Sequence, residues 1–332
     1  MLVTAASRRV SLVQGFRNAL QLLAVRGAVI VTDVNPLSPA VHVADRAYRV
    51  PMSSDPAYLD EILAICAAER IQLLVPTIDD ELTAFGAARE RFAAQGVMVA
   101  CSSDAVNTLC NDKYATCVHL RAAGVSAARS YLPTEVSPGV EPPLFIKPRT
   151  GRGAVGAFAV GSRRELEFFL DYVQDPIVQE YLEGPEFTID VLCDFDGRPL
   201  AIVPRERVVI RAGVIDRGRT VDDPGLIALA RATCAAIRFA GPINIQCRMR
   251  GSHPVVFEIN PRFSGGIPLT IHAGADFPHM LIRLALGKRM EPEIGAFRAG
   301  LWMTSFESSF FLESDEIVRS GFDRVRRLTE VA

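Results

Sequence analysis

Short runs of branched apolar residues alternate with longer amphipathic stretches along the first hundred residues. The runs predict β-strands, and the amphipathic stretches predict helices. The predicted strands cover residues 2–4, 29–32, 73–76 and 97–100, and the predicted helices cover residues 10–25, 58–69 and 81–94. Because parallel neighbouring strands need a crossover helix between them, this alternation predicts an amino-terminal α/β domain with a Rossmann-like parallel sheet.

The first strand-to-helix turn carries no dinucleotide-binding signature. Its sequence, Ala5-Ala6-Ser7-Arg8-Arg9, lacks the G-x-G-x-x-G glycines that let backbone approach a pyrophosphate. Asp33 ends the second strand, where a dinucleotide fold would place a ribose-binding carboxylate. Without the glycines, we expect Asp33 to cap the next turn instead. The sequence therefore disfavours a dinucleotide site at this turn and a nucleotide-binding role for Asp33.

Strands in quick succession, with fewer helices, follow in the rest of the chain. The capping residues Ser103-Asp104 predict the start of a helix that continues through Asn111-Asp112-Lys113. Further strands are predicted at 144–147, 157–160, 177–182, 187–193 and 200–203, and further helices at 163–173, 227–237 and 278–286. The last of these helices fits an exposed surface or a buried core equally well.

A glycine-rich loop follows the strand that ends at Lys147-Pro148. The loop reads Arg149-Thr150-Gly151-Arg152-Gly153-Ala154-Val155-Gly156. A Walker P-loop places its lysine after the glycines and runs into a helix, so the order of residues excludes that motif. Glycines of this kind let backbone N–H groups fold over phosphate oxygens, with Lys147 as a point charge at the root of the loop. On its own, the loop is equally compatible with a hairpin tip that binds nothing.

Two strand-like segments, 243–250 and 255–260, are separated by Gly251-Ser252-His253-Pro254, which predicts a β-hairpin. We predict that Arg250 pairs with Pro254 around a three-residue loop. In that antiparallel register, position 246 lies directly opposite position 258.

Three polar side chains then share one face of the hairpin: Gln246, Glu258 and Asn260. A carboxylate with two amide oxygens is a set of hard oxygen ligands, and magnesium is usually held by one or two carboxylates together with substrate phosphates. Arg262 lies just beyond the strand, where its planar, permanently charged guanidinium suits phosphate oxygens. The alternative is an ordinary hairpin whose polar face is turned to water.

Arg205, Arg207 and Arg211 form a cluster of like charge after the predicted strand at 200–203. The cluster is compatible with a solvated strand face and with an anion site that faces the hairpin.

Composition indicates a globular protein, because 332 residues with 49% hydrophobic content suffice for two or three domains with substantial cores. The net charge of -2 gives no electrostatic reason to expect nucleic acid or an anionic membrane as a partner. No apolar stretch approaches the roughly 20 residues that a membrane helix needs. Seven scattered cysteines without a C-x-x-C pair indicate buried thiols in a reducing compartment. We therefore expect a soluble cytoplasmic protein.

Taken in order, the chain offers a helix lysine, a strand lysine followed by a glycine loop, a strand ending in Glu180-Tyr181-Leu182, and the Gln, Glu and Asn of the hairpin. This order resembles the ATP-grasp superfamily, and most closely the synthetase units of the carbamoyl phosphate synthase large chain. The resemblance covers nearly the whole chain. It implies an amino-terminal α/β domain (1–102), a small ATP-grasp subdomain with the glycine loop (103–182), and a large subdomain with the metal site and a carboxy-terminal extension (183–332).

The resemblance also implies a role for each matching residue. ATP phosphates are expected to contact Lys113, Lys147 and the loop containing Gly151, Gly153 and Gly156. Adenine is expected at Glu180, Tyr181 and Leu182, mostly through backbone, and the ribose hydroxyls at Glu186. Magnesium, or manganese in its place, is expected at Gln246, Glu258 and Asn260. The residues expected to act in catalysis are Arg262, Lys147 and Arg205.

Two departures from the synthase limit the expected reaction. The chain is too short to hold the two synthetase units and the additional domains of the full large chain, so one stand-alone unit is expected. Lys113 and Lys147 stand where the synthase units tend to have arginines, which favours the carboxylate-amine ligases of the superfamily. The leading hypothesis is a ligase that uses ATP to join a small carboxylate to an amine. An ATP-binding module without turnover, a kinase and a carbamoyl-phosphate-type synthetase are the alternatives, and a homodimer is one candidate for the oligomeric state.

Overall fold

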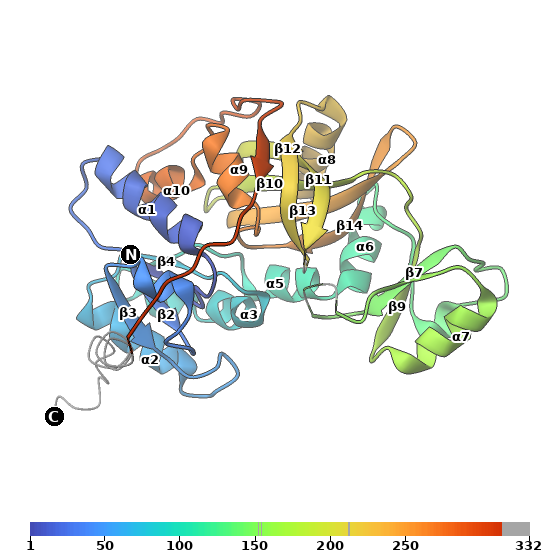
Figure 1. Cartoon of the computed structure of the whole chain (residues 1–332), viewed down its shortest axis with the longest axis horizontal. Helices are drawn as coiled ribbons and strands as arrows, with labels where there is room; N and C mark the ends of the chain where they lie inside the picture. The colour runs from blue at the N-terminus through green and yellow to red at the C-terminus, as the bar shows by residue number, and fades with distance from the viewer. Residues whose placement is uncertain (152, 154, 212, 314–332) are drawn as a thin grey trace.

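The computed structural model describes residues 1–151, 153, 155–211 and 213–313. Within this part of the chain, the strands form three sheets. In Figure 1 the amino-terminal sheet lies at the lower left, the largest sheet at the upper centre and the smallest at the right. The end of the predicted carboxy-terminal extension, 314–332, lies outside the described residues.

The amino-terminal sheet is parallel, with strand order β3-β2-β1-β4-β5. Its strands are β1 (Leu2–Val3), β2 (Ile30–Asp33), β3 (Arg46–Arg49), β4 (Leu73–Val75) and β5 (Met98–Val99). Its helices are α1 (Val10–Leu22), the short 3-10 helix η1 (Pro39–His42), α2 (Tyr58–Ala68), α3 (Asp79–Ala87) and α4 (Arg89–Ala93). The predicted parallel α/β domain is therefore confirmed, although the sequence did not indicate β3. That edge strand buries only its two central residues between exposed arginines.

Two helices connect this sheet to the rest of the chain: α5 (Asp104–Asn111) and α6 (Lys113–Ala122). Ser103 caps α5 as expected, because its side chain accepts a hydrogen bond from the backbone N–H of Val106. The prediction of one helix through Lys113 is wrong. Asp112 interrupts it with an extended backbone, and its carboxylate accepts from the N–H of Ala115 at 2.9 Å to cap α6. Lys113 is thus the first residue of a new helix.

The smallest sheet is antiparallel in the order β6-β9-β7-β8. Its strands are β6 (Ser130–Tyr131), β7 (Leu144–Pro148), β8 (Phe158–Val160) and β9 (Pro176–Glu180), and a 3-10 helix, η2 (Pro133–Glu135), follows β6. One face is covered by α7 (Arg163–Tyr172), which packs on β7 and β8. The glycine-rich loop joins β7 to β8 at one end of this sheet.

The largest sheet has the order β14-β13-β10-β11-β12-β15. Its strands are β10 (Glu186–Cys193), β11 (Pro199–Arg211), β12 (Val214–Thr220), β13 (Gly241–Arg250), β14 (His253–Asn260) and β15 (Trp302–Thr304). The helices that follow its strands are α8 (Pro224–Ala236), α9 (Ile267–His272) and α10 (Phe277–Ala285). The strand predicted at 200–203 is much longer than expected and pairs with β12, which the sequence did not indicate.

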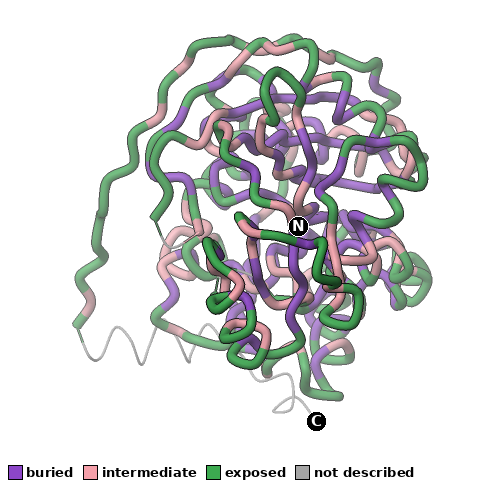
Figure 2. The backbone as a smooth tube through the Cα atoms, turned by 90° about the vertical axis from the view of Figure 1, so that its right-hand side faces the viewer, coloured by how far each residue is buried: buried purple, intermediate pink, exposed green. Residues whose placement is uncertain are grey.

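The amino-terminal sheet and the largest sheet share one hydrophobic core. Phe16 on α1 packs edge-on against Phe263, with ring centroids 5.9 Å apart, and both belong to a buried cluster that also contains Phe277 and Leu281 of α10. The helix predicted at 278–286 is therefore a core helix. Buried segments run through the interior of the molecule, while exposed segments form its outer turns (Figure 2). This shared core fixes the carboxyl edge of the parallel sheet beside the hairpin of β13 and β14.

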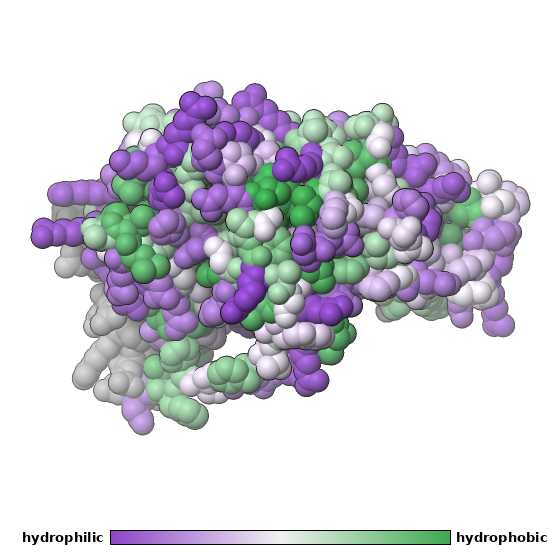
Figure 3. Space-filling view, turned by 90° about the horizontal axis from the view of Figure 1, so that it is seen from above, coloured by the Kyte–Doolittle hydropathy of each residue, from purple (hydrophilic) through white to green (hydrophobic). Residues whose placement is uncertain are grey.

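The outer surface is mixed rather than uniformly apolar. Seen from above, hydrophilic side chains cover most of the face, and hydrophobic ones gather in separate patches (Figure 3). None of the helices in the described part of the chain is long and apolar enough to cross a membrane. All seven cysteines are buried and unpaired, as the sequence predicted.

Candidate active site

A cavity of about 1180 Å³ lies where the three sheets meet. Its walls come from the glycine loop and β9 on one side, from β10, β11, β13 and β14 on another, and from the carboxyl edge of the parallel sheet. Typical ligand pockets occupy roughly 300–1,000 Å³. The cavity is therefore large enough for a nucleotide and a second ligand together.

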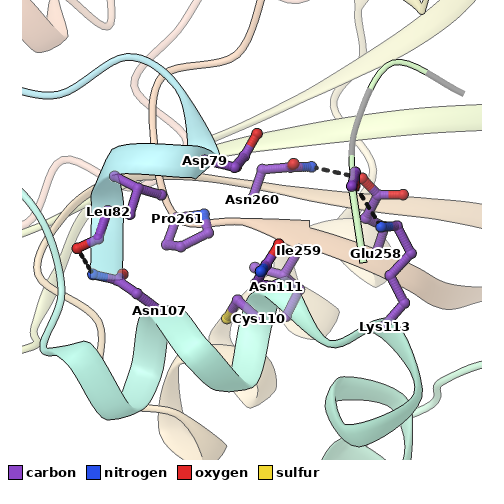
Figure 4. Close-up of a pocket in the computed structure, with 11 residues that line it drawn as sticks. Asp79, Leu82, Asn107, Cys110, Asn111, Lys113, Glu258, Ile259, Asn260 and Pro261 are labelled. Atoms are coloured by element: carbon purple, nitrogen blue, oxygen red, sulfur yellow. Dashed lines mark hydrogen bonds between the residues drawn. The ribbon is translucent and has the colours of Figure 1, made fainter. Parts of the chain in front are cut away.

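Most of the site residues expected from the sequence line this cavity: Lys147, Gly153, Glu180, Tyr181, Leu182, Glu186, Arg205, Gln246, Glu258, Asn260 and Arg262. Lys113 and Gly151 lie next to it, in a pocket of about 10 Å³ that Glu258 and Asn260 also line. In Figure 4 the side chain of Lys113 points towards Glu258. The expected site residues, which span 149 positions from Lys113 to Arg262, thus lie in one region of the structure.

The hairpin places Gln246 opposite Glu258, as predicted, but its turn and its strand register differ from the prediction. Arg250 pairs with His253 rather than with Pro254, so the turn has two residues and not three. A β-bulge between Gln246 and Cys247 then shifts the register by one residue and restores the expected pair. Because a slip of one residue moves side chains to the opposite face, the bulge keeps Glu258 on the cavity side.

The hairpin oxygens are held close together by hydrogen bonds. Asn260 Nδ2 donates to Glu258 Oε1 at 3.3 Å, and Arg262 Nη2 donates to Asn260 Oδ1 at 3.0 Å. No group of three or more His, Cys, Asp or Glu residues suited to a metal occurs in the described part of the chain. A cation here would therefore depend on amide oxygens and on oxygens that a ligand supplies.

Lys147 is buried at the centre of the site. Its Nζ donates to the carbonyl of Phe257 at 3.3 Å and lies 4.0 Å from Glu258 Oε2. Burial lowers the pKa of Lys147, and the negative charge of Glu258 opposes that shift. A buried ammonium with one distant carboxylate retains capacity to bind a further anion.

The glycine loop closes one side of the cavity. Gly151, Gly153 and Gly156 all have positive φ, at 99°, 74° and 71°, a conformation that glycine adopts without steric cost. Lys113 Nζ donates to the carbonyl of Gly151 at 2.6 Å, which ties α6 to the start of the loop. At the tip, the Gly153 backbone lies within 3.3 Å of the position that a Cβ on Gly213 would occupy. Arg152 and Ala154 lie outside the described residues.

The expected adenine end is formed by the end of β9. The Glu180 carboxylate accepts hydrogen bonds from the backbone of Arg129 at 2.8 Å and from the side chain of Arg250. Leu182 is buried and Tyr181 is partly exposed. Both of these hydrogen bonds end on Glu180 Oε1, and the residues 180–182 all line the cavity.

Glu186 is bonded to two arginines. Arg207 Nη1 contacts its Oε1 and Arg248 Nη2 contacts its Oε2, both at 2.7 Å. The carboxylate is thereby oriented at the cavity wall, with lone pairs left to accept hydrogen bonds from a ligand.

The three clustered arginines do not form one solvated face. Arg205 is 1% exposed and binds Asp190 through two hydrogen bonds of 2.7 and 3.0 Å. Arg207 is also buried, whereas the side chain of Arg211 is 66% exposed and pairs with Glu307. Arg205 Nη1 and Arg207 Nε are buried nitrogens without a hydrogen-bond partner among the described residues. The first two arginines therefore belong to the site.

The amino-terminal domain contributes residues that the sequence did not reveal. Arg262 donates to Asp79 Oδ2 through Nε at 3.0 Å and Nη2 at 2.7 Å. Arg9 Nη1 donates to the carbonyl of Ser264 at 2.8 Å, and burial together with the repulsion of Arg262 lowers the pKa of Arg9 to about 9. Arg9 follows β1 and Asp79 follows the neighbouring strand β4, so the available signal was the shared carboxyl edge of adjacent parallel strands.

Asp33 does not serve the cavity as a free carboxylate. Its Oδ1 accepts from the N–H of Asn35 at 2.9 Å and its Oδ2 from the N–H of Ser7 at 2.7 Å. This is the turn-capping role that the sequence predicted, and it also holds the first strand-to-helix turn, where Ala5 and Ser7 have positive φ.

Two family models match separate parts of the chain. Residues 172–308 match a family described as ATP-grasp in the biosynthetic pathway with Ter operon, and residues 1–100 match the PylC-like amino-terminal domain. These matches identify an ATP-grasp domain within residues 172–308, and the three-sheet architecture agrees with that assignment. More specifically, the chain combines a PylC-like amino-terminal domain with an ATP-grasp domain, and it is similar in sequence to carbamoyl phosphate synthase large chains.

Similarity to individual proteins is low and partial. The chain is 27% identical over 180 residues to the carbamoyl phosphate synthase large chain of Thermoanaerobacter sp. (strain X514), which covers 48% of this chain and 16% of that protein. It is 26% identical over 156 residues to the 3-methyl-D-ornithine–L-lysine ligase of Methanosarcina mazei, covering 46% and 40% of the two chains.

A solved structure extends the likeness to the fold. The biotin carboxylase domain of 2-oxoglutarate carboxylase from Hydrogenobacter thermophilus, crystallised with MgADP, superposes with a TM-score of 0.69 at 17% identity, covering 91% of this chain and 72% of that one. At this identity the likeness concerns the fold, which agrees with the predicted two-part ATP-grasp architecture.

Proposed function

We propose that this chain is an ATP-dependent ligase that activates a small carboxylate as an acylphosphate and joins it to an amine. The observation that carries the proposal is the cavity of about 1180 Å³ that Lys147, Gly153, the hairpin oxygens and Arg262 line together, with Lys113 and Gly151 in the adjoining pocket. Membership of the ATP-grasp superfamily and partial similarity to an amino-acid ligase support the same reaction class. Three units are proposed, at 1–102, 103–182 and 183–332.

The nucleotide fits the arrangement of donors and acceptors around the cavity. We assign its phosphates to Lys113, Lys147 and the glycine loop, its adenine to the backbone of 180–182 with Leu182 packing on the ring, and its ribose to Glu186. Burial lowers the pKa of Lys147, and triphosphate oxygens beside its Nζ would favour the charged ammonium. The loop glycines present backbone that can approach the phosphates closely.

The hairpin oxygens fit magnesium bound together with phosphates. Gln246, Glu258 and Asn260 supply one carboxylate and two amide groups, all at the cavity wall. To bind a cation beside Glu258, the Asn260 amide must rotate so that Oδ1 rather than Nδ2 points towards that carboxylate. When bound, magnesium would neutralise charge on the transferred phosphoryl group.

The chain's own residues then position two successive reactions. A carboxylate oxygen attacks the γ-phosphorus, the bond from that phosphorus to the β–γ bridging oxygen breaks, and ADP leaves. The amine nitrogen next attacks the acyl carbon, phosphate leaves, and the nitrogen loses a proton to solvent. Lys147 and Arg262 stabilise the spreading negative charge, and no nucleophilic side chain is needed. Lys113 and Lys147, in place of the synthase arginines, argue against carbamoyl phosphate as the product.

ADP release in the presence of pooled carboxylates and amines tests the proposal. Glu258→Ala should lower substrate-stimulated ADP release by about 100-fold or more, because it removes the only carboxylate of the proposed metal site. Glu167→Ala, an exposed carboxylate on α7, is the matched control and should retain full activity.

Two further outcomes separate the alternatives. If ATP binds but no pool raises ADP release above background, the chain is a binding module and the ligase proposal fails. If a stable phosphorylated substrate accumulates when every amine is present, the enzyme is a kinase or a phosphorylating synthetase.

A further inference from the structure

Three arginine side chains converge on the turn of residues 263–266, at the end of the cavity beyond the hairpin. We name Arg9, Arg205 and Arg262 the arginine cluster. Arg9 Nη1 donates to the Ser264 carbonyl at 2.8 Å, Arg205 Nη2 donates to Ser264 Oγ at 2.9 Å, and Arg262 Nη1 donates to the carbonyl of residue 263 at 3.1 Å. All three arginines line the cavity. They come from the first strand-to-helix turn, from β11 and from the segment after β14.

The arginine cluster holds more positive than negative charge. Asp79 binds Arg262 and Asp190 binds Arg205, each through two hydrogen bonds. Arg9 donates only to carbonyl oxygens, those of Ser264 and Thr77, among the described residues. Three guanidinium groups therefore share two directly bonded carboxylates. Arg9 is only partly exposed to water, and a partly buried cation without a bonded counter-ion favours uptake of an anion.

Glu81 does not supply the missing charge. It lies close enough to attract Arg9 electrostatically, but it is fully buried and accepts hydrogen bonds from Thr4, Tyr58 and Thr77. None of these hydrogen bonds joins Glu81 to Arg9, so in the described part of the chain the Arg9 guanidinium has no directly bonded carboxylate.

Arg205 also has hydrogen-bonding capacity to spare. The residue is 1% exposed, and its Nη1 has no acceptor in the described part of the chain. A Cβ on Gly266 would lie 2.3 Å from that nitrogen, so only glycine lets the turn of residues 263–266 pack this close to the guanidinium. A buried donor without an acceptor is uncommon in folded proteins and indicates a ligand group or a functional role.

We propose that the arginine cluster is a subsite for a substrate carboxylate other than the one that is activated. This inference rests on the proposed function and names its substrate class: one of the two substrates carries an additional carboxylate. The ATP phosphates are assigned to Lys113 and Lys147, and the transferred phosphoryl group to Lys147 and Arg262. Arg9 and the unpartnered Nη1 of Arg205 therefore remain for this group, with Arg262 lying between the two ligands. The extra carboxylate belongs either to the acid that becomes phosphorylated or to the amine, as in an amino acid.

Paired substrates decide which molecule carries the group. In the first arm, ADP release is measured with pooled amines and with succinate against butanoate, or glutamate against glutamine. In the second arm, pooled carboxylates are combined with alanine against ethylamine, or lysine against cadaverine. In one arm, the member with the extra carboxylate should have a KM about 10- to 100-fold lower, the range expected for hydrogen bonds to a charged group.

Arg9→Gln should abolish most of that preference and leave the KM for ATP unchanged. Arg9→Lys, which keeps the charge but loses the planar fork, should retain part of it. The control is Arg17→Gln on α1, the helix that follows Arg9. Among the described residues, the Arg17 side chain is bonded to the Val43 carbonyl and to Asp45, so the variant should behave as wild type. Equal loss of activity on both members of each pair would assign Arg9 a purely structural role and overturn the proposal.

The failure of this inference can be told apart from failure of the proposed function. If wild-type protein releases ADP with some pool but treats both members of every pair alike, the subsite is wrong and the ligase assignment stands. If no pool stimulates ADP release, the proposed function fails, and the cluster is tested by thermal melting with sodium sulfate at constant ionic strength. Sulfate should then raise the melting temperature of wild type and of Arg17→Gln more than that of Arg9→Gln. Equal shifts in all three proteins would overturn the anion subsite.

Discussion

Asp112 lies between α5 and α6, directly before Lys113. Replacing Asp112 tests how the start of α6, and with it Lys113, is held in place. One carboxylate oxygen caps α6 by accepting from Ala115, and the other accepts from Arg149 Nε at 2.9 Å and Nη2 at 2.5 Å. The backbone N–H of Lys113 also donates to the Arg149 carbonyl at 3.0 Å. Asp112 therefore joins the start of α6 to the start of the glycine loop.

The two contacts can be separated by two substitutions. Asp112→Asn keeps a capping side chain but loses the charge, whereas Asp112→Ala loses both. A cap is worth about 1 kcal/mol, and a partly exposed ion pair, discounted for solvent screening, about 0.5–1 kcal/mol. We expect Asp112→Asn to destabilise the protein by about 0.5–1 kcal/mol and Asp112→Ala by about 1.5–2 kcal/mol. At roughly 2–4 °C per kcal/mol for large domains, the difference is measurable by thermal melting followed by circular dichroism.

The dependence of these losses on pH gives a second readout. Burial alone would disfavour the charged carboxylate of Asp112, but hydrogen bonds from Arg149 and Ala115 outweigh it, so its pKa lies below the ordinary value. A carboxyl group whose pKa is lowered by folding stabilises the protein above its unfolded pKa of about 3.9 and loses that contribution as the pH falls through the folded pKa. The advantage of wild type over Asp112→Asn should therefore shrink below about pH 4. Equal melting temperatures for Asp112→Asn and Asp112→Ala at pH 7 would refute the assignment of a separate capping contact.

Two further predictions concern the loop and the core. Gly153→Ala forces an alanine into a left-handed conformation, φ 74°, at a cost of about 1 kcal/mol, and should raise the KM for ATP about 5-fold in an ADP-release assay. Gly287→Ala imposes the same conformation, φ 71°, where nothing crowds the new Cβ, and should leave that KM unchanged; an equal rise in both variants would contradict a role for the loop tip. Phe16→Ala removes the ring that packs on Phe263 and should destabilise the protein by about 3–5 kcal/mol in urea unfolding. Phe168→Ala, at an exposed ring on α7, should cost less than about 1 kcal/mol, and similar losses for both would contradict the shared core.

Local signals in the sequence predicted much of the scaffold because they act over a few residues. Periodicity identified the parallel sheet, and the alternation of side chains along a strand placed Gln246, Glu258 and Asn260 on one face. The turn of the hairpin escaped prediction, since a two-residue turn with a bulge gives the same pair as a three-residue turn without one. The helix α5 ends before Asp112, although the sequence pattern continues through it. The Asp112 side chain caps α6 and binds Arg149, and the sequence pattern does not report these contacts.

Contacts between distant segments could not be predicted in the same way. The bonds from Arg9 to Ser264 and from Asp79 to Arg262 join residues 255 and 183 positions apart. No periodic pattern reports such pairs, since they arise only when the parallel sheet docks on the largest sheet. The arrangement of Arg205 beneath Gly266 likewise depends on how the turn after β14 packs against β11. The carboxyl edge of the parallel sheet was the one general indication that these residues would meet.

The hydrophobic core shared by α1, α10 and Phe263 also restricts how chains with this fold can diversify. A recombination event that exchanges the first hundred residues for those of a relative would bring in a new partner for Arg262 and a new wall for the cavity. It would also replace Phe16 and its neighbours, leaving Phe277 and Leu281 against a surface of different shape. We expect recombination at the proposed boundary near residue 102 to yield a stable hybrid only when α9 and α10 come from the same parent protein as the amino-terminal part. The packing between the amino-terminal sheet and the largest sheet therefore affects the shape of the cavity and the folding stability together.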